Sequence, residues 1–165
     1  MPPFRKNARL VDDERRADPG AVRAAAITHL ARRDFAQLEL HEKLTSRGFD
    51  ADTVASVLAE LAGERLLDDE RYAHNYVSLH GRRGQGPVRI AADLRQLGLP
   101  GELIEAALAS GPDWHALARS ARVARFGPKA PGSWPEKARQ ARFLQYRGFS
   151  SDHIRTATGA DPDLD

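Results

Sequence analysis

The chain has 165 residues, 41% of them hydrophobic and 29% charged, which is enough apolar material for a packed domain of this length. It contains no cysteine, which excludes a disulfide framework and thiolate metal sites, and no apolar run approaches the roughly 20 residues that a membrane span needs. Because the N-terminus is polar and has no signal-peptide segment, we expect a soluble cytoplasmic protein without membrane contacts.

In chain order, the sequence predicts an arm, three similar repeats and a tail. These are a mobile polar arm (residues 1–19), an acidic repeat 1 (20–68), repeat 2 (69–110), a basic repeat 3 (111–158) and an acidic tail (159–165). Each repeat begins with an amphipathic helix, predicted over residues 21–33, 70–83 and 114–125. No stretch has the period-two pattern of a strand. We therefore predict an all-α fold of three tandem three-helix repeats, stacked into an elongated, curved array because each repeat alone buries too little surface.

Three glycines mark the repeats. Gly48, Gly98 and Gly148 are 50 residues apart, and each follows a stretch whose apolar residues are three and four apart. A glycine just past a helix end takes the left-handed backbone that other residues avoid, and the apolar residue after it folds back onto the helix. A short third helix then begins at Asp50, Pro100 or Ser150. We expect these three glycines to do nothing except end helices.

Two connections between helices are predicted to be irregular. The glycines of Gly84-Gln85-Gly86 loosen the chain before Pro87, which suits the first position of the next helix. The segment from Gly127 to Pro135 is rich in glycine and proline and is predicted to be a loop.

The sequence contains no constellation that indicates catalysis. No two of the six histidines stand four residues apart beside a carboxylate, as a helical zinc site would need. The carboxylates of Asp68-Asp69-Glu70 directly precede a predicted helix, where capping is the expected role. Gly84-Gln85-Gly86 follows no strand and lacks a third glycine, so it is no dinucleotide fingerprint. We therefore expect no enzymatic activity, no cofactor and no metal.

The charges and the basic residues favour binding to a polyanion. Residues 34–70 hold three basic and ten acidic residues, whereas residues 111–148 hold eight basic and two acidic residues. Arginines end one predicted helix and recur at spacings of three along others: Arg82, Arg83 and Arg89 in repeat 2, and Arg119, Arg122, Arg125, Arg139 and Arg142 in repeat 3. Guanidinium groups match phosphate oxygens, which indicates binding to a phosphate backbone without sequence selection. The alternatives are solvated helices, or ion pairs with the acidic repeat 1.

The aromatic side chains are interpreted mainly as packing residues. Phe143 and Tyr146 belong to this group, whereas Trp134, in its predicted loop, is a candidate for stacking on a nucleic-acid base.

Several phrases of the sequence are distinctive when they are taken together. They are Leu67-Asp68-Asp69-Glu70-Arg71-Tyr72-Ala73, Arg82-Arg83-Gly84-Gln85-Gly86-Pro87-Val88-Arg89-Ile90, Arg47-Gly48-Phe49 and Arg147-Gly148-Phe149. Over residues 21–157 the chain resembles the RecX family of bacterial regulatory proteins, whose phrases run D-D-x-R-F-A and R-G-x-G-P-x-R-I. Two positions depart from the family pattern. At Ala36 the family has a Ser or Thr helix cap, and we expect Asp34 to serve instead; at His80 the family favours a basic residue.

The resemblance implies a modulator of the RecA recombinase. Such a protein binds in the groove of the RecA filament on single-stranded DNA and inhibits its ATPase, recombination and co-protease activities, which modulates DNA repair and the SOS response. We expect a monomer that contacts single-stranded DNA, with duplex DNA as an alternative ligand. The positions that match the family's signature are Arg82, Arg83, Gly84, Gly86, Pro87 and Arg89. The full set of candidate RecA- or DNA-binding residues adds the basic residues Arg32, Arg33, Lys43, Arg119, Arg122, Arg125, Arg139 and Arg142.

Two other functions fit parts of the sequence. A general DNA-binding protein that uses its three-helix units as helix-turn-helix readers predicts sequence-selective duplex binding without RecA. A helical scaffold for another protein predicts no salt-sensitive DNA binding.

Overall fold

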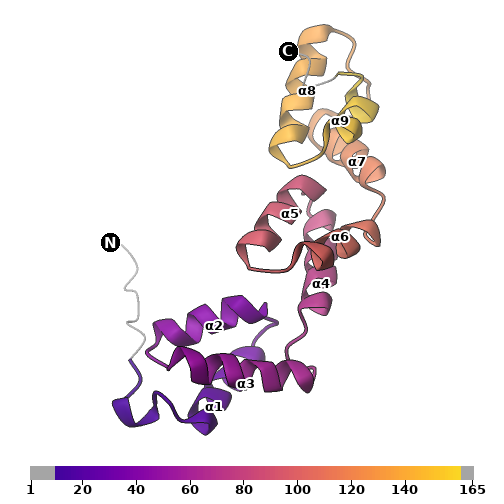
Figure 1. Cartoon of the computed structure of the whole chain (residues 1–165). Coiled ribbons are helices and arrows are strands. Elements are labelled where there is room, and N and C mark those ends of the chain that lie inside the picture. Colours follow the sequence, from indigo (N-terminus) through magenta and orange to yellow (C-terminus); the bar gives the residue numbers. More distant parts are fainter. Residues whose placement is uncertain (1–9, 161–165) are drawn as a thin grey trace, which may run out of the picture. The chain divides into compact units, whose positions relative to one another are not determined.

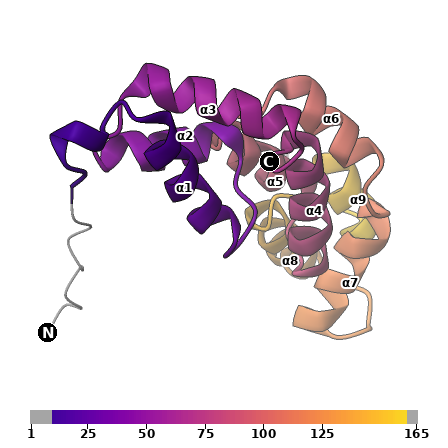
Figure 2. The same cartoon turned by 90° about the horizontal axis from the view of Figure 1, so that it is seen from below.

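The computed structural model describes residues 10–160, which are all α-helical apart from short connections and one 3-10 turn. The nine helices of this range are α1 (Pro19–Leu30), α2 (Gln37–Ser46), α3 (Ala51–Gly63), α4 (Asp69–Arg82), α5 (Pro87–Gln96), α6 (Gly101–Ala109), α7 (Trp114–Phe126), α8 (Trp134–Tyr146) and α9 (Ser151–Thr158) (Figure 1 and Figure 2). The predicted all-α class with three groups of three helices is therefore confirmed. None of the described helices is long and apolar enough to cross a membrane.

The chain divides into two compact units, which we call unit 1 (residues 1–72) and unit 2 (residues 73–165). Unit 1 contains α1–α3 and the first turn of α4, and unit 2 contains the remaining helical residues. We keep the names repeat 1, repeat 2 and repeat 3 for α1–α3, α4–α6 and α7–α9.

Repeat 1 is held together by aliphatic side chains at helical spacing. Within it α1 and α2 both pack on α3, and Leu40, Leu44, Val54, Leu58 and Leu61 are fully buried. Side chains three and four residues apart form one stripe on a helix, so each helix turns its stripe toward the other two. Burying one such side chain is worth about 1.5–3 kcal/mol, which stabilises helices too short to persist alone in water.

Gly48, Gly98 and Gly148 follow the ends of α2, α5 and α8, as the repeat predicts. Their φ angles are +103°, +82° and +92°, in the left-handed region, and the apolar residue after each glycine is buried. The third helices begin where expected. For example, the carboxylate of Asp50 accepts a hydrogen bond from the N–H of Thr53 at 3.0 Å.

Residues 10–18, the described part of the predicted arm, lie against the turn of repeat 1. They include a 3-10 turn, η1 (Asp13–Arg15). The N–H of Val11 donates to the carbonyl of Arg47 at 2.9 Å, and the N–H of Asp50 donates to the carbonyl of Arg16 at 2.8 Å. Helix ends leave carbonyl groups without partners, and the segment satisfies the one at Arg47. These bonds attach residues 11–16 to repeat 1, where the sequence predicted mobility. Residues 1–9 of the arm and 161–165 of the tail lie outside the described residues.

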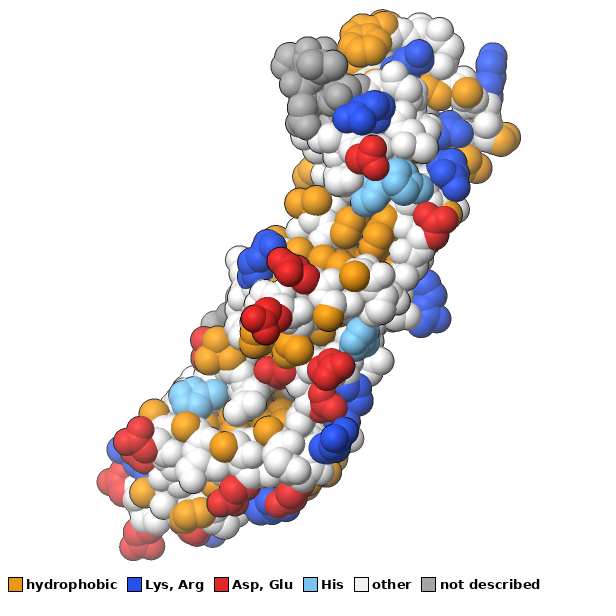
Figure 3. All heavy atoms as spheres, turned by 45° about the vertical axis from the view of Figure 1, so that its right-hand side comes forward, with side chains coloured by type: hydrophobic (Ala, Val, Ile, Leu, Met, Phe, Trp, Pro, Cys, Tyr) orange, Lys and Arg blue, Asp and Glu red, His pale blue; other side chains and the backbone are white. Residues whose placement is uncertain are grey.

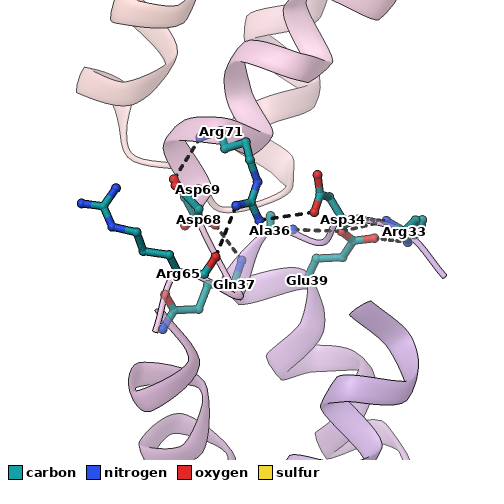
Figure 4. Close-up of polar contacts among 9 residues, drawn as sticks. All are labelled: Arg33, Asp34, Ala36, Gln37, Glu39, Arg65, Asp68, Asp69 and Arg71. Carbon is teal, nitrogen blue, oxygen red and sulfur yellow. Dashed lines mark hydrogen bonds and ion pairs between the residues drawn. The ribbon is translucent and has the colours of Figure 1, made fainter. Parts of the chain in front are cut away.

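The N-terminus of α2 is capped from the start of α4, within unit 1. The N–H of Gln37 donates to a carboxylate oxygen of Asp69 at 2.8 Å, and Asp68 caps α4 itself by accepting from the N–H of Arg71 at 3.0 Å (Figure 4). The expected capping role of this acidic cluster is thus confirmed. Two adjacent aspartates thus cap the N-termini of two helices, Asp69 that of α2 and Asp68 that of α4.

The expectation that Asp34 caps α2 is wrong. The carboxylate of Asp34 instead pairs with the guanidinium of Arg71 at 3.4 Å, and Arg71 also donates to the carbonyl of Arg65 at 3.3 Å. Asp34 precedes the N-cap residue Ala36 by two positions, outside the place from which a side chain normally reaches the first helical turn. The sequence could not show that a residue 32 positions away supplies the cap.

Repeats 2 and 3 are joined inside unit 2 by a close approach of two backbones. The N–H of Gly86 donates to the carbonyl of Arg147 at 2.8 Å, and the N–H of Val88 donates to the carbonyl of Gly148 at 2.9 Å. A Cβ atom added to Gly86 would lie under 3.0 Å from the backbone of Gly148, and one added to Gly148 would lie under 3.0 Å from Arg89. Only glycine fits at both positions.

The close contact between Gly86 and Gly148 corrects two expectations from the sequence. Gly86 is buried and fixes the connection between α4 and α5, where we expected the glycines to loosen it. Gly148 does more than end α8, because its missing side chain lets α5 begin against the turn of repeat 3. The contact joins segments that are far apart in the sequence, so no local pattern reports it.

Candidate nucleic-acid interface

A cleft lined by four arginines opens in unit 2, and we call it the arginine cleft. Arg82 and Arg83 at the end of α4, Arg125 at the end of α7, and Arg147 just after α8 surround a volume of about 350 Å³. The apolar part of its lining comes from α7 and α8 and includes Leu117, Ala121, Ala124 and Phe143. The hydrogen bonds between Gly86 and Arg147 and between Val88 and Gly148 hold the two sides of the cleft together. The close backbone approach thus builds the cleft.

Aromatic rings lie beside guanidinium groups in the cleft and in the hollow next to it. The guanidinium carbon of Arg147 lies 5.1 Å from the centre of the Phe143 ring, and that of Arg139 lies 5.4 Å from the centre of the Phe126 ring. The two rings meet edge to face at 5.3 Å. A second hollow, lined by Arg125, Phe126, Arg139 and Phe143, adjoins the cleft through two shared residues. Cations over ring faces are attracted without losing their charge, so these arginines stay available to an anion.

The charge of the arginine cleft is not neutralised within the described part of the chain. Among residues 10–160, no carboxylate lies within 4.0 Å of the guanidinium groups of Arg82, Arg83, Arg125 or Arg147. Arg82 is oriented by Ser78, whose hydroxyl accepts from Nη2 at 3.1 Å. Four cations that share a concave surface raise the local potential and favour phosphate, which guanidinium binds in a bidentate way.

The predicted arginines of α7 divide into exposed and buried ones. Arg119 and Arg125 are exposed, but Arg122 is only 7% exposed. Its Nη1 atom donates to the carbonyl of Lys129 at 3.2 Å and to the side-chain oxygen of Gln140 at 3.4 Å. Arg122 follows the buried Ala118 by one helical turn and therefore points into repeat 3. The spacing of three made Arg122 a binding candidate beside Arg119 and Arg125, but its side chain is buried and bonds to the loop after α7.

The predicted basic residues of repeat 1 belong to unit 1, whereas the arginine cleft is lined by residues of unit 2. Arg33 pairs with Glu39 at 2.6 Å, and its guanidinium carbon lies 3.6 Å from the centre of the Phe35 ring. The hydrogen bond that Arg33 donates to the Glu39 carboxylate raises the pKa of Arg33, and the carboxylate compensates its charge. Lys43 lies over the same ring at 5.5 Å, and Arg32 is exposed.

The residues of the Arg-Gly-x-Gly-Pro phrase have different roles. Gly84, with φ of +86°, lines the arginine cleft. Pro87 is the first residue of α5, as predicted. Arg89 is exposed while its Cβ atom faces Gly148. His80 is half-buried, its ring stacks on Tyr76 at 3.8 Å, and its Nδ1 atom lies 3.0 Å from the side-chain oxygen of Gln85. His80 therefore packs against its own repeat.

Arg147 was missing from the predicted set. It stands in the phrase Arg147-Gly148-Phe149, which marks the repeat, but its contribution depends on the tertiary approach to α4. Arg47 holds the same place in repeat 1, so the only available signal was the repetition of arginine before the turn glycine. Among residues 10–160, no three His, Asp or Glu side chains are grouped as metal ligands.

The surface charges follow the repeats. Figure 3 shows acidic side chains over unit 1 and mainly basic ones over repeat 3. This matches the count of ten acidic residues in residues 34–70 and eight basic residues in residues 111–148. Unit 2 thus carries both the basic charge and the concave surface.

Comparison with known proteins identifies the family. Models of the first, second and third three-helix domains of RecX match residues 23–61, 68–108 and 113–158. The chain belongs to the RecX family. A protein named Regulatory protein RecX from Halorhodospira halophila is 48% identical over 141 residues, which cover 85% of this chain and 88% of the relative. One of the same name from Ectopseudomonas mendocina is 40% identical over 146 residues, with 87% and 97% covered.

A solved structure supports the same fold. The crystal structure of RecX from Lactobacillus salivarius superposes with a TM-score of 0.74 and 23% sequence identity, covering 85% of this chain and 94% of that one. The RecX family consists of regulatory proteins, which confirms the expectation that this chain is a regulator and not an enzyme.

Proposed function

We propose that this RecX protein binds RecA filaments on single-stranded DNA and inhibits their ATPase, recombination and co-protease activities, which modulates DNA repair and the SOS response. The observation that carries the proposal is the arginine cleft, read together with membership of the RecX family. RecA is the protein partner, and the DNA within its filament is the polyanion.

The arginine cleft suits a phosphate backbone better than it suits a small molecule. Its four guanidinium groups come from three helix ends, and the exposed Arg119, Arg139 and Arg142 extend the positive charge along α7 and α8. An extended array of arginines binds successive phosphates and carries no sequence information. A regulator that must act on any sequence within a filament needs such a contact.

The helix-turn-helix alternative finds less support in the third helix of each repeat, which would be the reading helix. Helix α3 contains Asp52 and Glu60 and no Lys or Arg, and α6 contains Glu102 and Glu105 and no Lys or Arg. Helix α9 contributes only Arg155. The net negative helices α3 and α6 are repelled by the phosphates of a duplex, and α9 has a single basic residue beside Asp152.

The test is the RecA ATPase assay with single-stranded DNA, in which the full-length protein should slow ATP hydrolysis at ratios up to equimolar. The variant Arg82→Ala/Arg83→Ala/Arg147→Ala removes three cations of the cleft and should weaken inhibition by at least about tenfold. A matched control, Arg15→Ala/Arg65→Ala/Arg95→Ala, removes three exposed arginines that lie outside the cleft and outside the set of candidate binding residues, and it should inhibit like the unaltered protein.

Direct binding to labelled single-stranded DNA provides a second readout. Each phosphate contact lowers log K by about 0.7 per decade of salt on a single strand, so the cleft variant should have a slope shallower by about 2. Equal loss of inhibition in the cleft variant and in the control would show that only net charge matters. Full inhibition by a folded cleft variant would contradict the proposed site.

A further inference from the structure

Helix α8 exposes an aromatic side chain that the packing interpretation does not explain. Tyr146, the last residue of α8, is 83% exposed, the highest exposure among the large hydrophobic side chains of residues 10–160. We interpreted it from the sequence as a packing residue, and that interpretation is wrong. An aromatic ring in water gives up the burial that normally accounts for its presence. A ring so exposed is available to a partner.

The surroundings of Tyr146 on α8 are cationic. Arg142 and Arg139 precede it by four and seven residues, which places all three side chains on one face of the helix. All three are exposed, and among residues 10–160 no carboxylate lies within 4.0 Å of either guanidinium group. We call Arg139, Arg142 and Tyr146 the α8 strip.

The α8 strip lies beside the arginine cleft. Arg147, the next residue, lines the cleft, and Arg139 lines the hollow that adjoins it. One helical turn separates Arg142 from Tyr146, a rise of about 6 Å. A cation and a ring at this separation can engage the phosphate and the base of the same short stretch of nucleic acid. The strip therefore continues the positive surface and adds a flat apolar group to it.

We infer that Tyr146 is a base-stacking residue that makes this surface selective for single-stranded over double-stranded DNA. This inference rests on the proposed function, because it names the ligand of the same positive surface. In a duplex the bases already stack on one another, so only an unpaired base offers its face to a protein ring. Every base has such a face, and the contact therefore tolerates any sequence.

The other exposed aromatic of α8 is the natural control. Trp134 is 55% exposed and begins the helix, about 18 Å along the axis from Tyr146. It was the stacking candidate that the sequence suggested, but Arg139 and Arg142 share a helix face with Tyr146, whereas Trp134 lies five residues before Arg139 and off that face. The two rings give opposite expectations for two single substitutions.

The experiment measures binding of the full chain to oligo-dT and to an abasic oligonucleotide with the same number of phosphates. Tyr146→Ala should weaken binding to oligo-dT by about 5- to 100-fold, the range for one stacked base, and Tyr146→Phe should restore it. Binding of Tyr146→Ala to the abasic strand and to duplex DNA should be unchanged. Trp134→Ala should match the unaltered protein on all three ligands.

Four results would overturn the inference. They are unchanged oligo-dT binding by Tyr146→Ala, an equal loss on the abasic strand, a loss with Trp134→Ala in its place, and failure of the unaltered protein to bind oligo-dT. The RecA ATPase assay distinguishes failure here from failure of the proposed function. If the unaltered protein inhibits RecA and Tyr146→Ala binds oligo-dT normally, the stacking role is refuted and the proposed function is not. If binding to oligo-dT depends on Tyr146 but the unaltered protein does not inhibit RecA, the proposed function is refuted and the stacking role is not.

Discussion

Substituting Gly86 by alanine tests whether the backbone approach between repeats 2 and 3 builds the arginine cleft. The added Cβ would lie under 3.0 Å from the backbone of Gly148, which cannot move aside as a side chain can. Overpacking of this kind costs about 1–3 kcal/mol. The hydrogen bonds from Gly86 to Arg147 and from Val88 to Gly148 are worth about 1 kcal/mol each. The free energy of unfolding of unit 2 should therefore fall by about 3–5 kcal/mol.

The matched control is Gly101→Ala at the start of α6, because no atom lies within 4 Å of a Cβ added there. Its effect should be neutral, or stabilising by up to about 1 kcal/mol through the lower entropy of the unfolded chain.

Urea denaturation and amide hydrogen exchange measure the effect of Gly86→Ala. The Val88 amide should exchange at least about 100-fold faster, since each 1.4 kcal/mol corresponds to a factor of ten. Single-stranded DNA binding should also weaken, although no charged residue has changed. A Gly86→Ala protein with the stability and the Val88 exchange rate of the Gly101→Ala control would refute the close approach.

Three further predictions concern the rest of the chain. Asp69→Ala removes the cap of Gln37 and should cost about 1 kcal/mol in urea denaturation, whereas Asp34→Ala breaks only an exposed ion pair and should cost less than about 0.5 kcal/mol; a larger loss for Asp34→Ala would contradict the assignment of the cap. Burial first, and then the charge of His115, lower the pKa of His153 from its ordinary value of 6.5, so the folded state favours neutral imidazole. The resulting stability is fully present above about pH 6.5 and is lost as the pH falls toward the folded pKa, so the free energy of unfolding should decrease from pH 7 to 5.5. This decrease should be smaller in His153→Gln, and identical pH profiles would rule the contribution out. Solution scattering should give a radius of gyration clearly above about 15 Å, the value for a compact chain of this length, if the predicted elongated array is correct.

The helices and their ends could be predicted from the sequence because their signals are local. The turn glycines, Pro87 at the start of α5 and Asp50 as a helix opener each act within one or two turns of their own position. The absence of strand patterns fixed the class for the same reason. The family phrase around Arg82–Ile90 marked the connection between α4 and α5 as distinctive, but it did not predict the close backbone approach of Gly86 to Gly148.

The candidate site was predictable only in part, because its geometry depends on contacts between distant segments. Arg82 and Arg83 were found from their sequence, but Arg147 joins them only through the bond between its carbonyl and Gly86. Arg122 has the same spacing as its exposed neighbours and is nevertheless buried, because Gln140 of α8 and the loop after α7 pack against it, and the spacing does not report those contacts. The exposure of Tyr146 was equally invisible, because an aromatic residue at the end of an amphipathic stretch normally packs.

The turn carbonyl of repeat 1 and that of repeat 3 receive the same kind of partner. The carbonyl of Arg47 accepts the N–H of Val11, and the carbonyl of Arg147 accepts the N–H of Gly86. In both cases a segment that precedes a helix docks onto the turn. At the turn of repeat 1, residues 11–16 thus take the position that residues 86–88 take at the turn of repeat 3. A further repeat inserted before repeat 1 could dock through the same carbonyl of Arg47, as repeat 2 docks on repeat 3 through the carbonyl of Arg147.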